Sequence, residues 1–321
     1  MRSWAFQHRH QCEPMRNVVI FLVGPTGSGK SELALELAKK LNGEIVSCDS
    51  MQVYKGMDIG TAKPSLRHQR LVRHHLIDLF SARAECSVFR HSQLALKAID
   101  QILKTGKTPI LVGGSGLYLK SIRDGIPMQP GKRSNIRERL RKHVEQYGLR
   151  QLYARLERID PKRADAIHAN DERRIIRALE IWECSRKRPS DWIRETRGLQ
   201  LFGMKLWVFG LLRDRQELYA RVERRVDQMM ESGWIKEVEK LARVGWSKTA
   251  RAAIGYQEIL QYLRNGRDLE AAVGEIKKRT RHLVKKQMTW FRRDPRIRWI
   301  PTSGNQFVRP CVQTVLQEIG S

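Results

Sequence analysis

The octapeptide GPTGSGKS at Gly24–Ser31 directly follows the apolar run VVIFLV at Val18–Val23. It fits the pattern G-x-x-x-x-G-K-S, and a helical pattern begins at Lys30. A strand before such a loop and a helix after it indicate a phosphate-binding P-loop rather than a chance glycine-rich turn. Glycines allow backbone N–H groups to point at an anion, and the helix N-terminus favours negative charge. We therefore expect this loop to bind a di- or triphosphate group.

The loop also carries side chains that suit a phosphate ligand. The ammonium group of Lys30 adds a positive point charge, and the hydroxyl of Ser31 is suited to hold Mg²⁺ against the same phosphates. Mg²⁺ is therefore the expected cofactor, with Ser31 as its protein ligand. The expected diphosphate-binding residues are Gly24, Pro25, Thr26, Gly27, Ser28, Gly29, Lys30 and Ser31.

The order of segments predicts an α/β fold, P-loop NTPase-like, with a doubly wound parallel sheet and an all-helical insertion domain. Short apolar runs are typical of buried parallel strands, and helical patterns lie between them. The expected strands are Val18–Val23, Glu44–Cys48, His75–Leu79, Pro109–Val112 and Lys205–Leu212, the last of which should end the sheet. The expected helices are Lys30–Leu41, Val88–Lys104, a short one from Leu117, Asn135–Tyr147, Leu149–Arg158, Asp171–Arg186, Gln216–Glu231, Ile235–Val244 and Leu269–Arg292.

Strand patterns are missing between Gly125 and about Gly203, where basic helical patterns take over. We therefore expect a P-loop α/β core of residues 17–124 and 204–321, with a helical insertion domain at 125–203. Residues 1–16 show no pattern that ties them to this core, and we expect them to form a disordered extension.

The chain is strongly basic. Its 61 Lys and Arg residues against 34 Asp and Glu give a net charge of +27, with an isoelectric point near 10.4. A positive electrostatic field of this kind suits a protein that docks on a phosphate backbone, and the alternative is a basic surface that is merely solvated.

In the helix Leu269–Arg292 basic residues share one face, which should meet an anion. The opposite face should be buried and consists of Ile276, Leu283, Val284, Trp290 and Phe291.

The cysteines and apolar runs limit where the protein can act. The five cysteines are scattered and form no C-x-x-C pair, so neither a disulfide framework nor a zinc site is expected. The longest apolar run, Val18–Val23, is too short to span a bilayer, and residues 1–16 lack the apolar stretch of a signal peptide. We expect a cytoplasmic protein that does not associate with membranes.

A carboxylate follows the second expected strand, in the sequence Asp49-Ser50-Met51-Gln52. Ligands bind at the carboxyl edge of open α/β sheets, so Asp49 should lie beside the P-loop. A carboxylate there can act in acid–base catalysis, and the ordinary alternative is a turn residue that accepts from nearby N–H groups. The polar segment Tyr54–Pro64 that follows is typical of a functional loop.

Together these motifs resemble the bacterial tRNA dimethylallyltransferases, also called tRNA adenosine isopentenyltransferases. Besides Gly24–Ser31 and Asp49–Gln52, further segments between residues 17 and 293 occur in the family's order. They are Met57–Pro64, His74–Asp78, Gly113–Tyr118, Asn170–Asp171 with Arg174, Arg177–Glu180, Gly255–Glu258, Thr280–Arg281 and Gln287–Phe291. Ser115 stands where the family usually has Thr, and Arg173 where Gln is usual.

The resemblance implies a transferase that moves the dimethylallyl group from dimethylallyl diphosphate to N6 of the adenosine on the 3′ side of the tRNA anticodon. Pyrophosphate would leave, and the P-loop would stabilise its developing charge. By the same resemblance Asp49 would orient N6 and accept its proton, while Thr26 and Arg221 would clamp the diphosphate.

The partner implied is the anticodon stem-loop of tRNA, whose unpaired adenosine can be turned out of the stack to reach a buried carbon. The helical insertion domain would contact this RNA, and a monomer is expected. The expected tRNA-binding residues are Asp49, Ser50, Met51, Gln52, Ser115, Arg137, Arg173, Arg174, Ile175, Ile176 and Arg177.

Two other classes of protein fit parts of the pattern. A P-loop small-molecule kinase would need a lid with phosphate-clamping arginines and would act without RNA. A basic ATP-dependent RNA-binding module would need an apolar strand ending in paired acidic residues that hold Mg²⁺ for hydrolysis, and the sequence has no such strand.

Overall fold

The computed structural model describes residues 17–126, 133–194, 198–199, 203–266 and 268–320, so the expected extension at 1–16 lies outside the described residues. The chain divides into two compact units. Met1–Arg123 with Leu199–Ser321 form the first, which we call the α/β unit. Asp124–Gly198 form the second, which we call the helical unit.

Six parallel strands form the sheet of the α/β unit, in the order β3-β2-β4-β1-β5-β6. They are β1 Val18–Val23, β2 Gly43–Ser47, β3 His74–His75, β4 Thr108–Gly113, β5 Lys205–Arg213 and β6 Arg298–Thr302. Strands β1 and β4 are buried along their whole length because helices cover both faces of the sheet, as their mainly apolar sequences require. The predicted α/β class and parallel sheet are confirmed.

Two strands differ from the sequence prediction. Strand β5 does not end the sheet, because β6 pairs with it from Phe209↔Arg298 to Arg213↔Thr302. Strand β6 is an edge strand with Pro301 in it and without a continuous buried run, so it carries little strand signal. Strand β3 stops at His75, since Leu76 has a φ of 64° and turns the chain out of the extended conformation.

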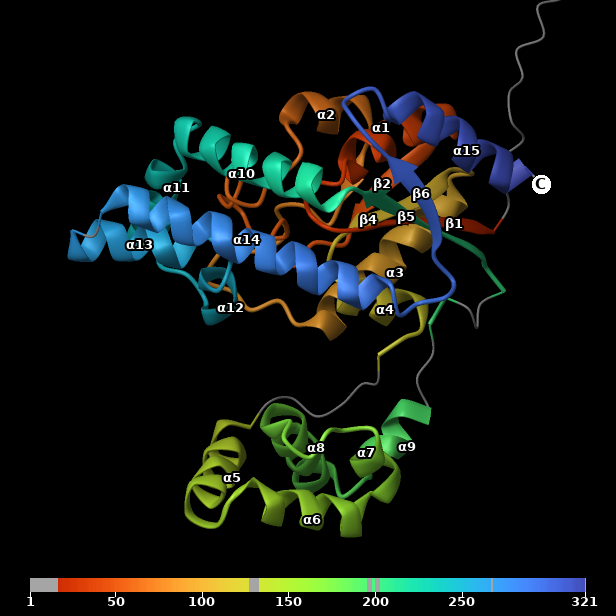
Figure 1. Cartoon of the computed structure of the whole chain (residues 1–321). Helices are drawn as coiled ribbons and strands as arrows, with labels where there is room; N and C mark the ends of the chain where they lie inside the picture. The colour runs from red at the N-terminus through yellow and green to blue at the C-terminus, as the bar shows by residue number, and fades with distance from the viewer. Residues whose placement is uncertain (1–16, 127–132, 195–197, 200–202, 267, 321) are drawn as a thin grey trace, which may run out of the picture. The chain divides into compact units, whose positions relative to one another are not determined.

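Helices cover the two faces of the sheet (Figure 1). Successive residues of β1 point to opposite faces, so Ile20 packs with one layer of helices and Phe21 with the other. The first layer consists of α1 Lys30–Lys40 and α15 Val308–Gly320, and the second of α3 Val88–Lys104 and α4 Gly116–Arg123.

Further helices of the α/β unit pack on the segment that follows β2, and α10 and α14 run side by side among them (Figure 1). Val53, Tyr54 and Met57 are buried against this group. The helices are α10 Arg215–Glu231, α11 Trp234–Val244, α12 Lys248–Arg251, α13 Tyr256–Asn265 and α14 Leu269–Phe291, and the short α2 Leu66–Leu71 precedes β3.

The burial of Trp290 was predicted wrongly. Phe291 is buried as expected, but Trp290 is 42% exposed and lies against Gly116 at the start of α4. A helical pattern shows which side chains share a face, whereas the neighbour that covers each of them depends on the tertiary fold.

The helical unit has its own core, which includes Leu140, Leu152, Leu156, Ile175 and Leu179. Its helices are α5 Ser134–Tyr147, α6 Leu149–Ile159, α7 Pro161–Asp165, α8 Glu172–Ser185 and α9 Pro189–Arg194. None of the helices in the described parts of the chain is long and apolar enough to cross a membrane.

Candidate functional site

The P-loop connects β1 to α1 at the carboxyl edge of the sheet. Gly24, Gly27 and Gly29 have φ angles of 141°, 79° and 98°, which glycine adopts without steric cost. A Cβ on Gly29 would also lie 2.1 Å from a ring carbon of Phe307. Among the described residues no side chain caps the N-terminus of α1, so its first N–H groups can bind an anion.

The side chain of Lys30 is buried inside this loop. Its Nζ donates to the carbonyl oxygen of Pro25 at 2.6 Å and lies 3.5 Å from Oγ of Ser28. Burial and, after it, the charge of Arg225 lower the pKa of Lys30 to about 7, although the charge of Asp49 opposes the change. A bound anion would restore the charged ammonium form, because it supplies the opposite charge.

Asp49 follows β2 and begins a turn. Its Oδ1 accepts from the backbone N–H groups of Met51, at 2.8 Å, and Gln52, at 3.4 Å. Burial raises the pKa of Asp49, while these two N–H groups and the charges of Lys30 and Arg225 limit the rise. Asp49 therefore fills the turn role that was its alternative interpretation, and Oδ2 accepts no hydrogen bond from any residue the structure describes.

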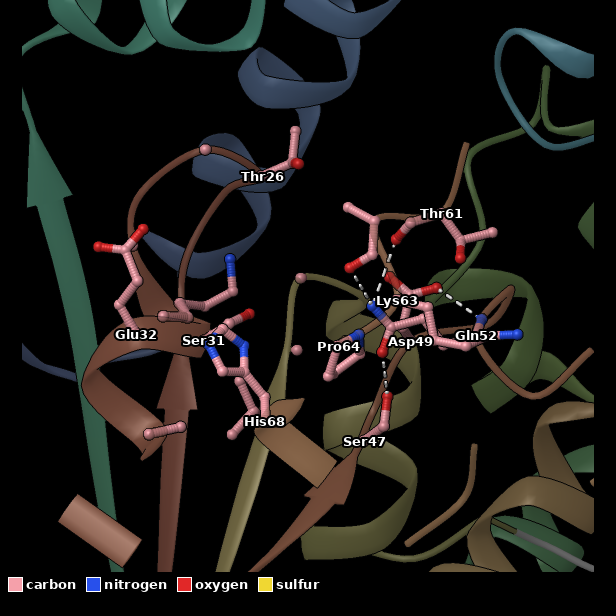
Figure 2. Close-up of a pocket in the computed structure, with 18 of the residues that line it drawn as sticks. Thr26, Ser31, Glu32, Ser47, Asp49, Gln52, Thr61, Lys63, Pro64 and His68 are labelled. Carbon is pink, nitrogen blue, oxygen red and sulfur yellow. Dashed lines mark hydrogen bonds between the residues drawn. The ribbon is translucent and has the colours of Figure 1, made fainter. Parts of the chain in front are cut away.

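Lys30 and Asp49 line the same cavity, whose volume is about 630 Å³. In Figure 2, Ser31, Glu32 and His68 lie on one side of this cavity, and Asp49 and Thr61 lie on the other. Helices α10 and α14 complete the wall through Arg221, Arg225 and Gln287. The cavity thus combines cations, backbone donors and the half-buried carboxylate of Asp49, which suits a polyanionic ligand that reacts beside a proton acceptor.

Two arginines of α10 reach the cavity. Arg221, which the resemblance implied, donates from Nε to the carbonyl of Gly27 at 3.1 Å and so braces the P-loop. Arg225 lies one turn further along α10 and has no ion-pair partner among the described residues. Burial lowers the pKa of Arg225, and Asp49 opposes this change. The sequence analysis did not identify Arg225, although its i, i+4 spacing from Arg221 was a usable signal.

Gln287 of α14 joins two loops of the cavity. Its Oε1 accepts from the backbone N–H of Thr26 at 2.9 Å, and its Nε2 donates to the carbonyl of Gly114 at 3.0 Å. The sequence analysis named Gln287 only as part of a motif, because a helix near the end of the chain cannot be placed beside the P-loop from spacing alone.

The segment Met57–Pro64 is held in place from both sides. Glu237 of α11 accepts from three consecutive N–H groups, those of Asp58, Ile59 and Gly60, at 2.7 to 3.2 Å. Lys63 donates to Asp58 and Asp78 at 2.5 Å each. The sequence predicted a functional loop here without identifying Glu237, its main anchor.

The side chain of Gln52, expected to bind tRNA, supports the same segment. Its Nε2 donates to the carbonyls of Thr61 and Ala62 at 3.3 Å each, and its Oε1 accepts from Ser47 at 2.8 Å. The neighbouring Ser50 and Met51 are half-buried, as is Ser115 at the start of α4.

The remaining expected tRNA contacts lie in the helical unit and fall into two groups. Arg173 and Arg174 are exposed on α8, but Ile175 and Ile176 are buried in the core of the unit, so their side chains face its interior. The expectation that residues 173–177 contact tRNA stays a prediction, and at the two isoleucines such a contact cannot use an exposed side chain. The cause is the helical period, which turns consecutive residues to different faces.

Arg137 and Arg177 both pair with the fully buried Glu180, at 2.9 and 2.7 Å. Burial opposes ionisation of Glu180, but hydrogen bonds from Arg177, the Arg133 N–H and Arg137 outweigh it and lower its pKa. These two arginines therefore neutralise a carboxylate inside the unit, at least in part.

Comparison with known proteins gives a consistent result. The protein family described as IPP transferase matches residues 52–294. A tRNA dimethylallyltransferase of Acetivibrio thermocellus is 44% identical over 289 residues, which cover 89% of this chain and 92% of the relative. One of Carboxydothermus hydrogenoformans is 43% identical over 308 residues, which cover 95% of this chain and 98% of the relative.

Solved structures agree with these relatives. The full-length tRNA isopentenylpyrophosphate transferase of Bacillus halodurans has a TM-score of 0.69 at 36% identity, covering 95% of this chain and 97% of that one. A eukaryotic dimethylallyltransferase acting on tRNA has a TM-score of 0.76 at 28% identity, covering 94% of this chain and 78% of that one.

We expect the binding of inorganic pyrophosphate to weaken as the pH rises through 7. Lys30 has a pKa of about 7 and loses its charge above that pH. Because the anion binds the charged ammonium form, Lys30 must then take up a proton when the anion binds. The affinity should fall by up to about ten-fold per pH unit from this cause. Titration calorimetry on both sides of neutrality would measure it.

The matched control is Lys30→Arg, which stays charged throughout this range. Its affinity should lose the part of the pH dependence that comes from Lys30 and keep the part that comes from pyrophosphate and from the other groups of the cavity, such as Asp49 and His68. The same pH dependence in both proteins would show that Lys30 does not titrate on binding.

Proposed function

The chain belongs to the IPP transferase family, and we propose that it transfers the dimethylallyl group of dimethylallyl diphosphate to N6 of the adenosine on the 3′ side of a tRNA anticodon. One observation carries this proposal. A P-loop built for a diphosphate and a half-buried carboxylate line one cavity, so a leaving group and a proton acceptor can face the same substrate. The relatives named tRNA dimethylallyltransferase support the reaction.

The reaction breaks the bond between C1 of the prenyl group and a diphosphate oxygen, which keeps the electron pair. We assign the stabilisation of this developing anion to the N–H groups at the start of α1, which no side chain among the described residues caps, and to the charge of Lys30, which lines the cavity. We assign the same role to Arg225 and to Arg221, whose guanidinium also holds the loop through Gly27. Thr26, held through its backbone by Gln287, would contact the diphosphate with its hydroxyl.

The attacking atom is the N6 amine of adenosine, which is weakly basic and loses a proton as it forms the new C–N bond. Asp49 is proposed to accept a hydrogen bond from N6 and then the proton. Its turn holds Oδ1 in place through two N–H groups. Its pKa is raised by burial, which moves a carboxylate toward the range where a general base works best near neutral pH.

A divalent cation fits beside the P-loop. Ser31 lines the cavity in the first turn of α1 and offers a hydroxyl, and Mg²⁺ typically takes few protein ligands together with phosphate oxygens and water. Mg²⁺ is the ion we propose, and when bound it would offset charge on the diphosphate. The described residues contain no cluster of three or more His, Cys, Asp or Glu side chains placed for a metal ion.

The tRNA anticodon stem-loop is the proposed partner, bound by positive charge and by the segment after β2. We assign base contacts to Ser50 and Met51 beside Asp49, and phosphate contacts to the exposed Arg173 and Arg174. We propose that the protein acts in the cytoplasm as a monomer.

Incubation with tRNA and dimethylallyl diphosphate should add one C5H8 unit to adenosine. Mass spectrometry of nucleosides from the digested tRNA would detect the added mass. A control with ATP in place of the prenyl donor should leave the tRNA unchanged. Unmodified tRNA in the presence of a bound donor would contradict the proposed reaction.

Replacing Asp49 by Ala should abolish most prenyl transfer while tRNA still binds, because the basic surface supplies most of the affinity. Loss of general-base assistance typically costs ~10²–10⁴ in rate, and it should appear in kcat more than in KM. Asp49→Asn should fall between the wild type and Ala, since an amide can orient N6 without taking its proton. Single-turnover prenylation measured beside tRNA binding would test this. Full turnover with weakened tRNA binding would mean that Asp49 only shapes the turn.

Replacing Arg173 and Arg174 together by Ala should raise KM for tRNA. The variant's affinity should also depend less on salt: the slope of log affinity against log salt concentration should become shallower by about one unit for each phosphate that it no longer binds. The matched control is Lys142→Ala on α5 of the same unit, whose side chain is exposed and lies 3.8 Å from Glu138. Arg177→Ala is unsuitable as a test of RNA binding, because it would remove an ion-pair partner from the buried carboxylate of Glu180. Steady-state kinetics at several salt concentrations would give both quantities, and an unchanged KM in the double variant would remove this surface from the proposed RNA path.

A further inference from the structure

The guanidinium of Arg221 contacts three separate segments of the α/β unit. Its Nε donates to the carbonyl of Gly27 in the P-loop at 3.1 Å, and its Nη1 donates to Oδ1 of Asn305 at 3.2 Å. Its Nη2 lies 3.8 Å from a carboxylate oxygen of Glu32 on α1. Asn305 belongs to the loop 303–307 between β6 and α15, which Figure 1 shows beside α1, and it does not line the cavity of about 630 Å³.

An ion pair fixes the start of this loop. Arg213, the last residue of β5, pairs with Glu217 of α10 and donates to the carbonyl of Gly304 at 2.9 Å. The carboxylate of Glu217 accepts in turn from the N–H of Gly304 at 3.0 Å. Gly304 has a φ angle of 60°, which glycine adopts without steric cost, so the chain turns here. Both polar backbone groups of Gly304 are therefore bonded, and Asn305 follows directly.

The other end of the loop packs against the P-loop. Phe307 is buried, and its ring occupies the space that a Cβ on Gly29 would need. The guanidinium of Arg213 lies over the same ring, 4.8 Å from its centroid. Asn305 lies between the anchored Gly304 and Phe307, so its position is defined although its side chain is exposed.

The contact with Asn305 restrains an arginine that has a competing partner. Without this contact the guanidinium of Arg221 would be free to turn toward Glu32, which has the opposite charge and lies within ion-pair distance. A cation paired with a carboxylate attracts an anionic ligand less strongly, and a long side chain that must be ordered on binding costs entropy. The amide of Asn305 avoids both costs, because its oxygen orients the guanidinium without cancelling its charge.

We propose that Asn305 is a positioning residue of the diphosphate site, which directs the guanidinium of Arg221 toward the P-loop and away from Glu32. This inference rests on the proposed function, since that function assigns Arg221 to the diphosphate. Asn305 itself touches neither the ligand nor the reacting atoms in this assignment and acts only through Arg221.

The test is a double-mutant cycle in which titration calorimetry measures the affinity for inorganic pyrophosphate. The four proteins are the wild type, Asn305→Ala, Arg221→Ala and the double variant. Asn305→Ala should bind pyrophosphate about five- to ten-fold more weakly, near the lower end for the loss of a hydrogen bond to a charged group. In the Arg221→Ala background the same change should alter the affinity by less than about two-fold, because no guanidinium is left to direct.

Gln306→Ala is the matched control. Gln306 is the neighbouring exposed amide in the same loop, and it makes no hydrogen bond to any residue that the structure describes. This variant should bind pyrophosphate as the wild type does. In prenylation assays Asn305→Ala should lower kcat/KM for dimethylallyl diphosphate by a factor similar to its loss of pyrophosphate affinity and leave KM for tRNA unchanged.

The assignment to Asn305 is overturned if Asn305→Ala binds pyrophosphate as well as the wild type or better. It is also overturned if the loss is the same with and without Arg221, because Asn305 would then support the fold of the loop alone. A failure of the proposed function looks different. In that case the coupling between Asn305 and Arg221 in pyrophosphate binding would remain, yet no prenyl group would be transferred to tRNA.

Discussion

The site depends on keeping the cations of Lys30 and Arg225 and the carboxylate of Asp49 together in one cavity. Burial disfavours the charged form of each group, lowering the pKa of Lys30 and of Arg225 and raising that of Asp49. Lys30 and Arg225 also repel each other. The cavity therefore carries an electrostatic cost that a diphosphate would relieve, and in the proposed reaction the same positive charge would stabilise the leaving anion. The fully buried strands β1 and β4 on which the loops rest offset this cost.

Helices from the second half of the chain hold this cluster in place. Arg221 of α10 grips the carbonyl of Gly27, and Gln287 of α14 joins the N–H of Thr26 to Gly114. Glu237 of α11 fixes the segment after Asp58 through three N–H groups. Each contact satisfies a backbone group that a flexible loop would leave to water, so the loops gain a defined shape at the cost of ordering a few side chains. Preorganisation of this kind makes charge stabilisation effective during a reaction.

The sequence was most informative where one local pattern determines the structure. The apolar run of β1, the loop glycines and the helix from Lys30 could be predicted, as could the parallel sheet. Strand β6 could not, because an edge strand needs no continuous apolar run and tolerates Pro301. Arg225 and Gln287 were also missed as site residues, since they reach the P-loop only through the packing of α10 and α14. For the same reason the exposure of Trp290 could not be read from its place on an apolar face.

The count of 61 Lys and Arg residues overstates how many cations are free to meet a phosphate backbone. Arg137 and Arg177 pair with the buried Glu180, and Arg213 and Arg281 pair with Glu217 and Glu223. Glu180 is buried, and losing its partners would be costly, so Arg137 and Arg177 are needed inside the fold. Arg173 and Arg174 differ, because both are exposed. Arg174 pairs with Asp171, but Asp171 lies at the N-terminus of α8, which already stabilises the charge of this carboxylate. RNA affinity should therefore follow where exposed arginines lie rather than how many the chain contains.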